Sequence, residues 1–248
     1  MRALLRITTT VLLFALISPF SAIAQEKMSV AVAANYISAF KEIAAAFEEK
    51  SGVKVEGTFS STGSLYNQIK NGAPYDLFLS ADDTRPQLLH DEGLGDEPFI
   101  YARGRAILWS SNHDFCAGTD WKEAIKGSSG KISIANPVTA PYGAVAMKAV
   151  EEAGMAELLN KRFVTAQTVA QSFQYASTGA VDAGFCALSA IASEEGQGGC
   201  FYPIPEAAPV VQAACILERT EIRDAVERFA AFLISEEALA IMQTFGYE

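Results

Sequence analysis

The chain has 248 residues, of which 50% are hydrophobic, and a formal net charge of −10 at pH 7. This acidic balance argues against nucleic-acid binding, which requires a basic surface. It does not exclude a small anion, because backbone N–H groups, hydroxyls and helix N-termini hold anions without a cationic side chain. Beyond the N-terminal region, no segment is long and apolar enough to span a bilayer.

The first 24 residues have the pattern of a secretory signal peptide. Arg2 and Arg6 form a short basic region, residues 7–20 are mostly apolar, and Ala-Ile-Ala at 22–24 supplies small residues at cleavage-site spacing. The alternative is an uncleaved anchor, but the apolar run is short for a membrane span. We therefore expect export, to the periplasm in a Gram-negative source. The cleavage site contains no cysteine, so nothing there indicates a lipid anchor.

The first half of the exported chain predicts alternating strands and helices from its apolar spacing. Strands are predicted at 27–34, 53–59 and 76–80, and helices at 37–50, 64–71 and 85–92. This β-α-β-α-β-α order is typical of a parallel sheet with helical crossovers.

The pattern changes near Gly104. Beyond it, strands are predicted at 105–110, 131–135, 161–166, 183–187 and 210–217, and helices at 121–126, 144–152, 169–177 and 222–244, the last with a break near Ser235. Two α/β segments indicate two lobes, for which 105–110 and 210–217 are the candidate crossing strands. We expect residues 25–104 and 216–248 in lobe 1 and residues 105–215 in lobe 2. A ligand would bind in the crevice between them.

Four turns between a predicted strand and a predicted helix carry small or polar residues. They contain Asn35, the pair Ser61 and Thr62, Tyr142, and Val169. The simpler interpretation of Asn35 is a helix cap, although its amide could also donate to an anion. Tyr142 either packs at the rim or donates through its phenol. Val169 is typical of a core residue, and only its backbone N–H could do polar work.

The second turn, Ser60-Ser61-Thr62-Gly63-Ser64, contains more hydroxyls than one helix cap needs. Hydroxyls donate as well as accept hydrogen bonds, so this turn is a candidate anion site. A hydrolase is the alternative, but Ser61 lacks the Gly-x-Ser-x-Gly elbow.

Acidic and sulfur-containing residues provide weaker candidates. Asp76, Asp82 and Asp83 could form a metal or paired-carboxylate site, but helix capping by Asp82-Asp83-Thr84 and a strand start at Asp76 are simpler explanations. The four cysteines permit two disulfides in three connectivities, and Cys200 and Cys215 flank a proline-containing segment that could bend back. Their spacing matches no zinc pattern, and the two histidines lie apart from them. The residues concerned are Cys116, Cys186, Cys200, Cys215, His90 and His113.

With the four turns in this order, the chain resembles the periplasmic molybdate-binding proteins of ABC uptake systems. The segments AVAANYISAF, GTFSSTGSLYNQIKNGAPYDLFLSADD and NPVTAPYGAVAMKAV carry the resemblance, which covers essentially the whole exported chain. It implies a two-lobed α/β periplasmic binding protein fold of type II, with mixed sheets flanked by helices and a cleft that closes over a tetrahedral oxyanion. It also implies a protein that is not an enzyme, has no cofactor and has no direct ligands to a metal cation, because molybdenum is bound as the oxyanion.

The resemblance places the oxyanion ligands on Asn35, Thr62 with its neighbour Ser61, Tyr142, and the backbone N–H of Val169. Asn35 stands where many members carry serine. Ala187 is a departure, because some members have a ligand-binding tyrosine there and a small residue where this chain has Tyr142. We expect Tyr142 to take over that role from the opposite turn.

We therefore expect a monomeric exported protein that binds molybdate or tungstate and delivers it to a membrane ABC permease. Phosphate keeps a proton near neutral pH and would need an acceptor, which the four turns supply poorly. The alternatives are another oxyanion or a small carboxylate ligand, a secreted hydrolase using Ser61 or the Asp82-Asp83 pair, and an interaction module without a ligand.

Overall fold

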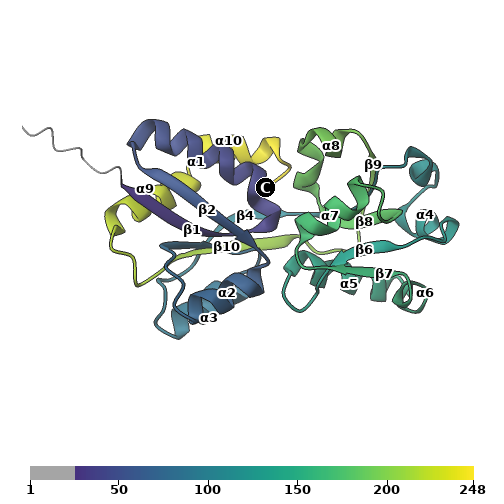
Figure 1. The fold of residues 1–248 in the computed structure, drawn as a ribbon, viewed down its shortest axis with the longest axis horizontal. Coiled ribbons are helices and arrows are strands. Elements are labelled where there is room, and N and C mark those ends of the chain that lie inside the picture. The colour runs from purple at the N-terminus through teal and green to yellow at the C-terminus, as the bar shows by residue number, and fades with distance from the viewer. Residues whose placement is uncertain (1–25) are drawn as a thin grey trace, which may run out of the picture.

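The computed structural model describes residues 26–248, which form two lobes side by side along the long axis of the molecule (Figure 1). The signal peptide expected at residues 1–24 lies outside the described residues. Each lobe contains a five-stranded sheet of mixed direction, flanked by helices. The two-lobed α/β architecture expected from the sequence is thereby confirmed.

The sheet of the first lobe has the strand order β2-β1-β3-β10-β4. β1 is parallel to β2 and β3, whereas β10 is antiparallel to β3 and β4. The strands are β1 Lys27–Ala33, β2 Lys54–Ser60, β3 Leu77–Leu79, β4 Phe99–Gly104 and β10 Val210–Ile216. The helices are η1 Ala34–Tyr36, α1 Ile37–Ser51, α2 Thr62–Lys70, α3 Thr84–Asp91, α9 Arg223–Leu233 and α10 Glu236–Thr244.

Helices cover both faces of this first sheet, with α1, α9 and α10 on one side and α2 and α3 on the other (Figure 1). β1 is therefore apolar over most of its length, as expected for a strand covered on both faces. The buried face of α1 presents Phe40 and Phe47 to Phe229 of α9, at ring-centroid distances of 6.4 and 5.0 Å. This packing fixes α1, and with it η1, at the end of β1.

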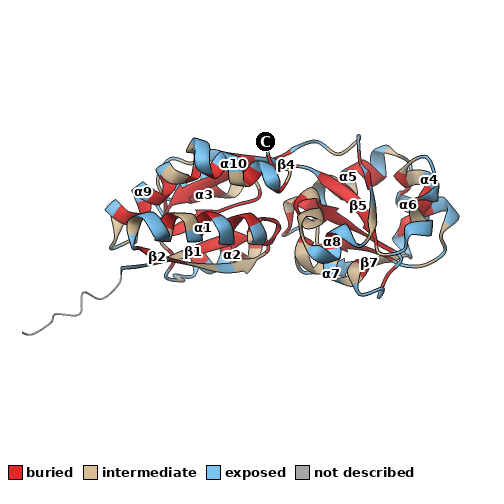
Figure 2. Ribbon diagram, turned by 90° about the horizontal axis from the view of Figure 1, so that it is seen from above, coloured by how far each residue is buried: buried red, intermediate tan, exposed pale blue. Residues whose placement is uncertain are grey.

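The sheet of the second lobe has the order β7-β6-β8-β5-β9. β6 is parallel to β7 and β8, and β5 is antiparallel to β8 and β9. The strands are β5 Ala106–Ser110, β6 Ile132–Ala135, β7 Phe163–Ala166, β8 Ala183–Ala187 and β9 Cys200–Pro203. The helices are η2 His113–Ala117, α4 Trp121–Gly127, α5 Pro141–Glu152, α6 Ala156–Asn160, α7 Val169–Ser177, η3 Leu188–Ala192 and α8 Glu194–Gln197. The buried residues follow the two sheets (Figure 2). One large hydrophobic cluster lies in the first lobe and another mostly in the second, and each sheet has a smaller cluster on its other face.

The chain crosses between the lobes twice. The first crossing lies at the expected boundary after residue 104, but the second does not lie where we expected it, and neither is made by a strand. One lies at Arg105, between β4 of the first sheet and β5 of the second, and the other lies between β9 and β10. β10 belongs entirely to the first sheet, so the boundary expected between residues 215 and 216 cuts through this strand. The strands at 106–110 and 210–216 are therefore members of one sheet each, and the crossing is made by the short connections before them.

The two strands that the sequence did not predict, β4 and β9, lie at sheet edges. β4 contains Arg103 and Gly104, and β9 has only four residues and ends at Pro203. Short strands with charged residues or proline are typical of edges, where the apolar pattern is weak. The predicted break near Ser235 is confirmed, because its Oγ accepts a hydrogen bond from the N–H of Ala238 at the start of α10.

The cysteines form one disulfide rather than two. Cys116 of η2 is bonded to Cys200 of β9, so the link between Cys200 and Cys215 that we considered is wrong. Cys186 and Cys215 are free and buried. Burial raises the pKa of the Cys186 thiol and raises that of Cys215 to about 12. Both thiols are therefore protonated at neutral pH and behave as small apolar side chains.

Candidate functional site

The four turns identified in the sequence meet at one small cavity between the lobes. Each turn follows a strand and begins a helix, in the orders β1–η1, β2–α2, β6–α5 and β7–α7. The lining is made of ten residues: Ala33, Ala34, Asn35, Ser61, Thr62, Ala81, Ala140, Pro141, Tyr142 and Val169. All five candidate ligand residues are among them. The structure thus brings together residues that lie up to 134 positions apart in the sequence, from Asn35 to Val169.

Thr62 is a donor whose acceptor side is already occupied. Its Oγ1 accepts a hydrogen bond from the N–H of Ala81, at 3.0 Å, and the residue is buried. The hydroxyl proton is therefore free to donate to another acceptor, and Thr62 lines the cavity. Ser61 precedes the first residue of α2, and its Oγ lies 2.8 Å from Ser64 Oγ instead of capping the helix. The predicted cap is therefore absent at this turn.

Tyr142 reaches the cavity from the first turn of α5. The Pro-Tyr-Gly sequence allows this approach because a Cβ atom on Gly143 would lie 2.1 Å from the carbonyl oxygen of Ala135, at the end of β6. Tyr142 is 3% exposed, and its phenol oxygen has no hydrogen-bond partner among the described residues. Tyr247 and Asn35 lie close enough to affect its pKa, yet neither meets the geometry of a hydrogen bond. A buried hydroxyl without a partner is costly, so this one is available to a ligand.

Asn35 lies inside η1 and does not cap the helix, so the capping interpretation is wrong. Its Nδ2 donates to Gln212 Oε1 at 2.7 Å and to the Tyr247 hydroxyl at 3.1 Å. Both amide protons are thus used within the first lobe, and Oδ1 is buried without a partner. In this arrangement, the group that Asn35 can offer an anion is its backbone N–H at the start of η1.

Val169 is the first residue of α7, where Thr168 Oγ1 caps the helix by accepting from the N–H of Gln171 at 3.1 Å. The side chain of Val169 is buried, as expected for a core residue. Its N–H is in the first turn, where no intrahelical acceptor exists. Ala187, at the end of β8, does not line the small cavity.

Three hydrogen bonds hold the lobes closed around the cavity. The N–H of Gly63 donates to Thr139 O at 2.8 Å, and Ser189 Oγ donates to Asn35 O at 2.9 Å. Arg85 Nη2 donates to Val138 O at 2.9 Å. The cavity enclosed in this closed arrangement has a volume of about 10 Å³, which is near the minimum for a single water molecule. A polyatomic ion therefore enters only if these walls move apart.

A layer of buried polar residues lies behind the cavity, and the sequence did not predict it. Its tyrosine cluster, Tyr36, Tyr101, Tyr142 and Tyr247, surrounds the amides of Asn35 and Gln212. Burial raises the pKa of Tyr36, Tyr101 and Tyr142 well above the ordinary value, and that of Tyr247 to about 12. All four phenols are therefore neutral donors at physiological pH. Gln212 interrupts the apolar run of β10, and this was the one local signal that could have revealed the layer.

The acidic residues that suggested catalysis have structural partners. Asp82 Oδ1 accepts from the N–H of Arg85 in the first turn of α3, and Asp82 also pairs with the Arg85 guanidinium. Asp83 is at the N-cap position but makes no side-chain cap, and its Oδ1 accepts from Thr84 Oγ1 instead. Asp76 accepts hydrogen bonds from Ser29 N–H and from Thr220 Oγ1, at 2.8 Å each. Among residues 26–248, no group of three or more His, Cys, Asp or Glu side chains is placed to hold a metal ion. Within the same range, no helix is long and apolar enough to cross a membrane.

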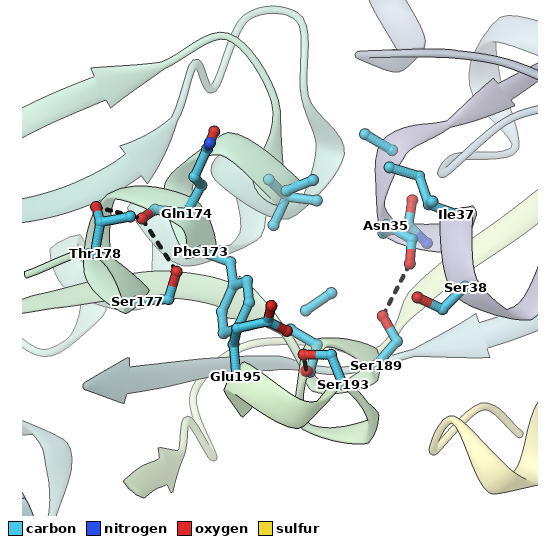
Figure 3. Close-up of a pocket in the computed structure, with 15 residues that line it drawn as sticks. Asn35, Ile37, Ser38, Phe173, Gln174, Ser177, Thr178, Ser189, Ser193 and Glu195 are labelled. Atoms are coloured by element: carbon cyan, nitrogen blue, oxygen red, sulfur yellow. Dashed lines mark hydrogen bonds between the residues drawn. The ribbon is translucent and has the colours of Figure 1, made fainter. Parts of the chain in front are cut away.

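A larger cavity of about 470 Å³ adjoins the small one and shares Ala34, Asn35 and Val169 with it. Figure 3 shows Asn35, Ile37 and Ser38 on one wall and side chains of α7 on the opposite wall. This cavity connects the candidate site with solvent along the interface of the lobes. Of the described residues, Glu195 is the only charged one that lines it.

Comparison with known proteins agrees with the fold. The sequence model of the bacterial extracellular solute-binding protein family matches residues 28–248. The molybdate-binding protein ModA of Azotobacter vinelandii is 36% identical over 227 residues, which cover 89% of each chain. ModA of Rhodobacter capsulatus is 37% identical over 220 residues, which cover 88% of this chain and 86% of the relative. The structure of the Azotobacter vinelandii periplasmic molybdate-binding protein has a TM-score of 0.83 and 30% identity, and the match covers 89% of this chain and 98% of that chain.

Proposed function

Since this chain belongs to the bacterial extracellular solute-binding protein family, we propose that it captures molybdate between its lobes and delivers it to a membrane ABC permease. Two relatives that match most of the chain are molybdate-binding proteins. The observation that carries the proposal is the composition of the small cavity. Four helix starts surround it, and none of its ten lining residues is charged.

A site of this kind favours a dianion over a cation. Helix N-termini carry a partial positive charge and N–H groups without intrahelical acceptors. Thr62 and Tyr142 add hydroxyl protons, and both residues are buried in the lining of the cavity. Hydrogen bonds from such donors to an ion are stronger than bonds between neutral groups. Neutral donors also leave no unpaired buried cation when the ligand departs.

The ligand residues that we propose are the backbone at Asn35, the hydroxyls of Ser61, Thr62 and Tyr142, and the N–H of Val169. For Asn35, this modifies the expectation from the sequence, because its side-chain amide is occupied by Gln212 and Tyr247. Tyr142 stands opposite the position of Ala187 and supplies a phenol that Ala187 cannot supply. The missing partner of the Tyr142 oxygen supports this role.

Selection among oxyanions follows from the same donors. A fully deprotonated anion such as molybdate, tungstate or sulfate accepts hydrogen bonds on every oxygen. Hydrogen phosphate carries a proton that needs an acceptor, and the one unpartnered amide oxygen in the lining is Asn35 Oδ1.

The same lining supports a protein that binds but does not catalyse. Ser61 has a hydroxyl neighbour, Ser64, and no histidine or carboxylate lines the cavity to act as its base. We also propose that the exported chain acts in the periplasm as a monomer, without a cofactor and without nucleic acid as a partner. The permease would recognise the lobes when they are closed on the ligand.

Titration calorimetry with the chain lacking residues 1–24 tests the proposal. We expect tight binding of molybdate and tungstate, weaker binding of sulfate, and no binding of phosphate near neutral pH. A small carboxylate such as acetate serves as a further arm. Failure of all four oxyanions to bind would refute the proposed function. Binding of acetate alone would assign the protein to another ligand class.

A further inference from the structure

Gln212 is a fully buried amide in the strand that carries the chain back into the first lobe. It pairs with Ala102 of β4 beside an irregularity of the ladder, because the next pair is Ala213 with Ile100, which leaves Tyr101 of β4 without a partner in β10. A bulge leaves one residue out of the regular ladder and changes the direction of its side chain, and bulges are frequent beside functional sites. Here the residue left out of the ladder is Tyr101, and its neighbour across the strands, Gln212, is the only polar residue within β10.

The two ends of the Gln212 amide have different surroundings. Oε1 accepts a hydrogen bond from Asn35 Nδ2 at 2.7 Å and another from the Tyr101 hydroxyl at 3.3 Å. Tyr101 also donates to Ser80 O at 3.0 Å, which ties the amide to the end of β3. Nε2, by contrast, is buried without a hydrogen-bond partner among the described residues.

Gln212 Nε2 and Tyr142 Oη, neither of which has a hydrogen-bond partner, both lie close to Gly104. A Cβ atom on Gly104 would be 3.1 Å from Gln212 Nε2 and 1.9 Å from Tyr142 Oη. The donor and the acceptor are therefore separated by no more than the sum of these two distances. Gln212 belongs to the first lobe and Tyr142 to the second, and Gly104 precedes the crossing between them.

We propose that Gln212 is the positioning residue of the oxyanion site, which orients Asn35 through Oε1 and orients the Tyr142 phenol through Nε2 when the lobes close on the ligand. This inference rests on the proposed function. As Tyr142 donates its proton to the anion, its oxygen accepts from Nε2, and each bond polarises and strengthens the other. Gln212 thereby joins the ligand turns of both lobes at the point where the chain crosses, without touching the anion itself.

A double-mutant cycle between Gln212→Met and Tyr142→Phe tests the proposal. Methionine keeps the length and volume of glutamine but removes both polar ends of the amide. We expect Gln212→Met to raise the Kd for molybdate about tenfold or more, as for loss of a hydrogen bond in a buried network. In the Tyr142→Phe background, the same change raises the Kd by a factor at least about threefold smaller, because part of its effect passes through the phenol. A purely structural role would give the same factor in both backgrounds.

Gln212→Glu provides a second readout if the methionine variant folds poorly. A buried carboxyl has a raised pKa and, while protonated, keeps both a donor and an acceptor. We expect near-wild-type affinity at about pH 5.5 and a progressive loss toward about pH 8, as the carboxylate forms beside the anion. The titratable groups that face this position are the tyrosine cluster and Asp82. The tyrosines stay protonated throughout this range, and Asp82 is paired with Arg85 in the wild type and the variant alike.

Gln68 offers a matched control, since its Oε1 also accepts from a tyrosine, Tyr75, at 2.8 Å, but it lies on α2 away from the cavity lining. Gln68→Met and Gln68→Glu should leave the Kd within about twofold of wild type. The inference is overturned if Gln212→Met has the same effect with and without the Tyr142 hydroxyl, or if neither Gln212 variant changes affinity. Absence of oxyanion binding by the wild type would instead overturn the proposed function.

Discussion

Gly104→Ala is the substitution that separates closure of the lobes from the stability of each lobe. The added methyl carbon would lie 1.9 Å from Tyr142 Oη and 3.2 Å from Cζ of the same ring. Tyr142 belongs to the second lobe, so this collision exists only while the lobes are closed. Within the first lobe, the nearest atom is Gln212 Nε2 at 3.1 Å, which has to yield by only a few tenths of an ångström.

The size of the effect follows from how far Tyr142 must retreat. Non-bonded heavy atoms settle near 3.5 Å, so Oη must move by roughly 1.5 Å. The ring is 3% exposed and packed in the second core, which leaves it little room. Overpacking a buried site costs about 1–3 kcal/mol, and we expect the upper end here. Since only the closed state carries this cost, the Kd for molybdate should rise about 100-fold.

Titration calorimetry on four proteins measures this effect: wild type, Gly104→Ala, Tyr142→Phe and the double variant. Tyr142→Phe alone should weaken binding about tenfold, because it removes one donor to a charged ligand. The same change also removes the atom at 1.9 Å and leaves only the tight contact with Cζ. The double variant should therefore bind about as well as Tyr142→Phe, so that the effect of the methyl group largely disappears in the absence of the phenol oxygen.

Gly127→Ala, at the end of α4, is the matched control, because a Cβ atom there meets nothing within 4 Å. It should leave affinity unchanged and reports the effect of a Gly→Ala change on the unfolded chain. Wild-type affinity in Gly104→Ala would show that closure does not bring Tyr142 onto Gly104. Additive losses in the double variant would refute the collision as the cause.

Three further predictions concern single groups of the site and the scaffold. Thr62→Val should weaken molybdate binding about tenfold, which titration calorimetry measures. It should also lower the free energy of unfolding by roughly 1–3 kcal/mol, measured by urea denaturation, because the N–H of Ala81 loses its acceptor. Because of the tyrosine cluster, the free energy of unfolding should fall above about pH 10, by up to about 1.4 kcal/mol per pH unit for each tyrosine. The reason is that the raised pKa values keep these four phenols protonated in the folded state, whereas the unfolded state releases the protons. For Tyr247 this loss is complete only near its folded pKa of about 12, and urea denaturation over a pH series follows it. Reduction of the disulfide between Cys116 and Cys200, 84 residues apart, should lower the free energy of unfolding by up to roughly 4–5 kcal/mol, measured by urea denaturation with and without reductant.

Each of these predictions has its own control. Thr62→Ser keeps the hydroxyl and should retain most of the affinity, whereas an equal loss in both variants would show that loss of the hydroxyl is not the cause of the weaker binding. Stability that is constant up to about pH 11 would contradict the tyrosine prediction. For the disulfide, a variant with Cys186→Ala and Cys215→Ala should respond to reductant as the wild type does, because the two thiols that it lacks are buried and unpaired in the wild type.

Several features of this protein follow from local sequence. The apolar spacing predicts most strands and helices within a few residues, because burial on one helix face or on both strand faces imposes its period on the chain. The four strand-to-helix turns can be located in the same way, because each joins two strongly patterned elements. The edge strands β4 and β9 escaped prediction because edges need little apolar surface and tolerate charge and proline.

Which polar groups are free to bind depends on neighbours that are distant in the sequence. The Asn35 side chain is typical of a helix cap or of an anion donor, yet both of its amide protons are donated to Gln212 and Tyr247. The hydroxyl proton of Thr62 is available to a ligand because Thr62 Oγ1 acts as an acceptor toward the N–H of Ala81, 19 residues away. Cysteine pairing is likewise decided by which thiols the sheet places together, and Cys215 is instead enclosed in the first lobe.

The sequence by itself thus determined the order of elements, the four turns and the resemblance to molybdate-binding proteins, since these depend on residues close together in the chain. Only the tertiary structure decided that the turns meet in one cavity, that Tyr142 contacts Gly104, and that Gln212 lies between Asn35 and Tyr142. These contacts arise where the chain crosses between two separately packed sheets. The physical reason is that a hydrogen bond or a collision depends on distances of a few tenths of an ångström, and such distances are set by packing of whole lobes.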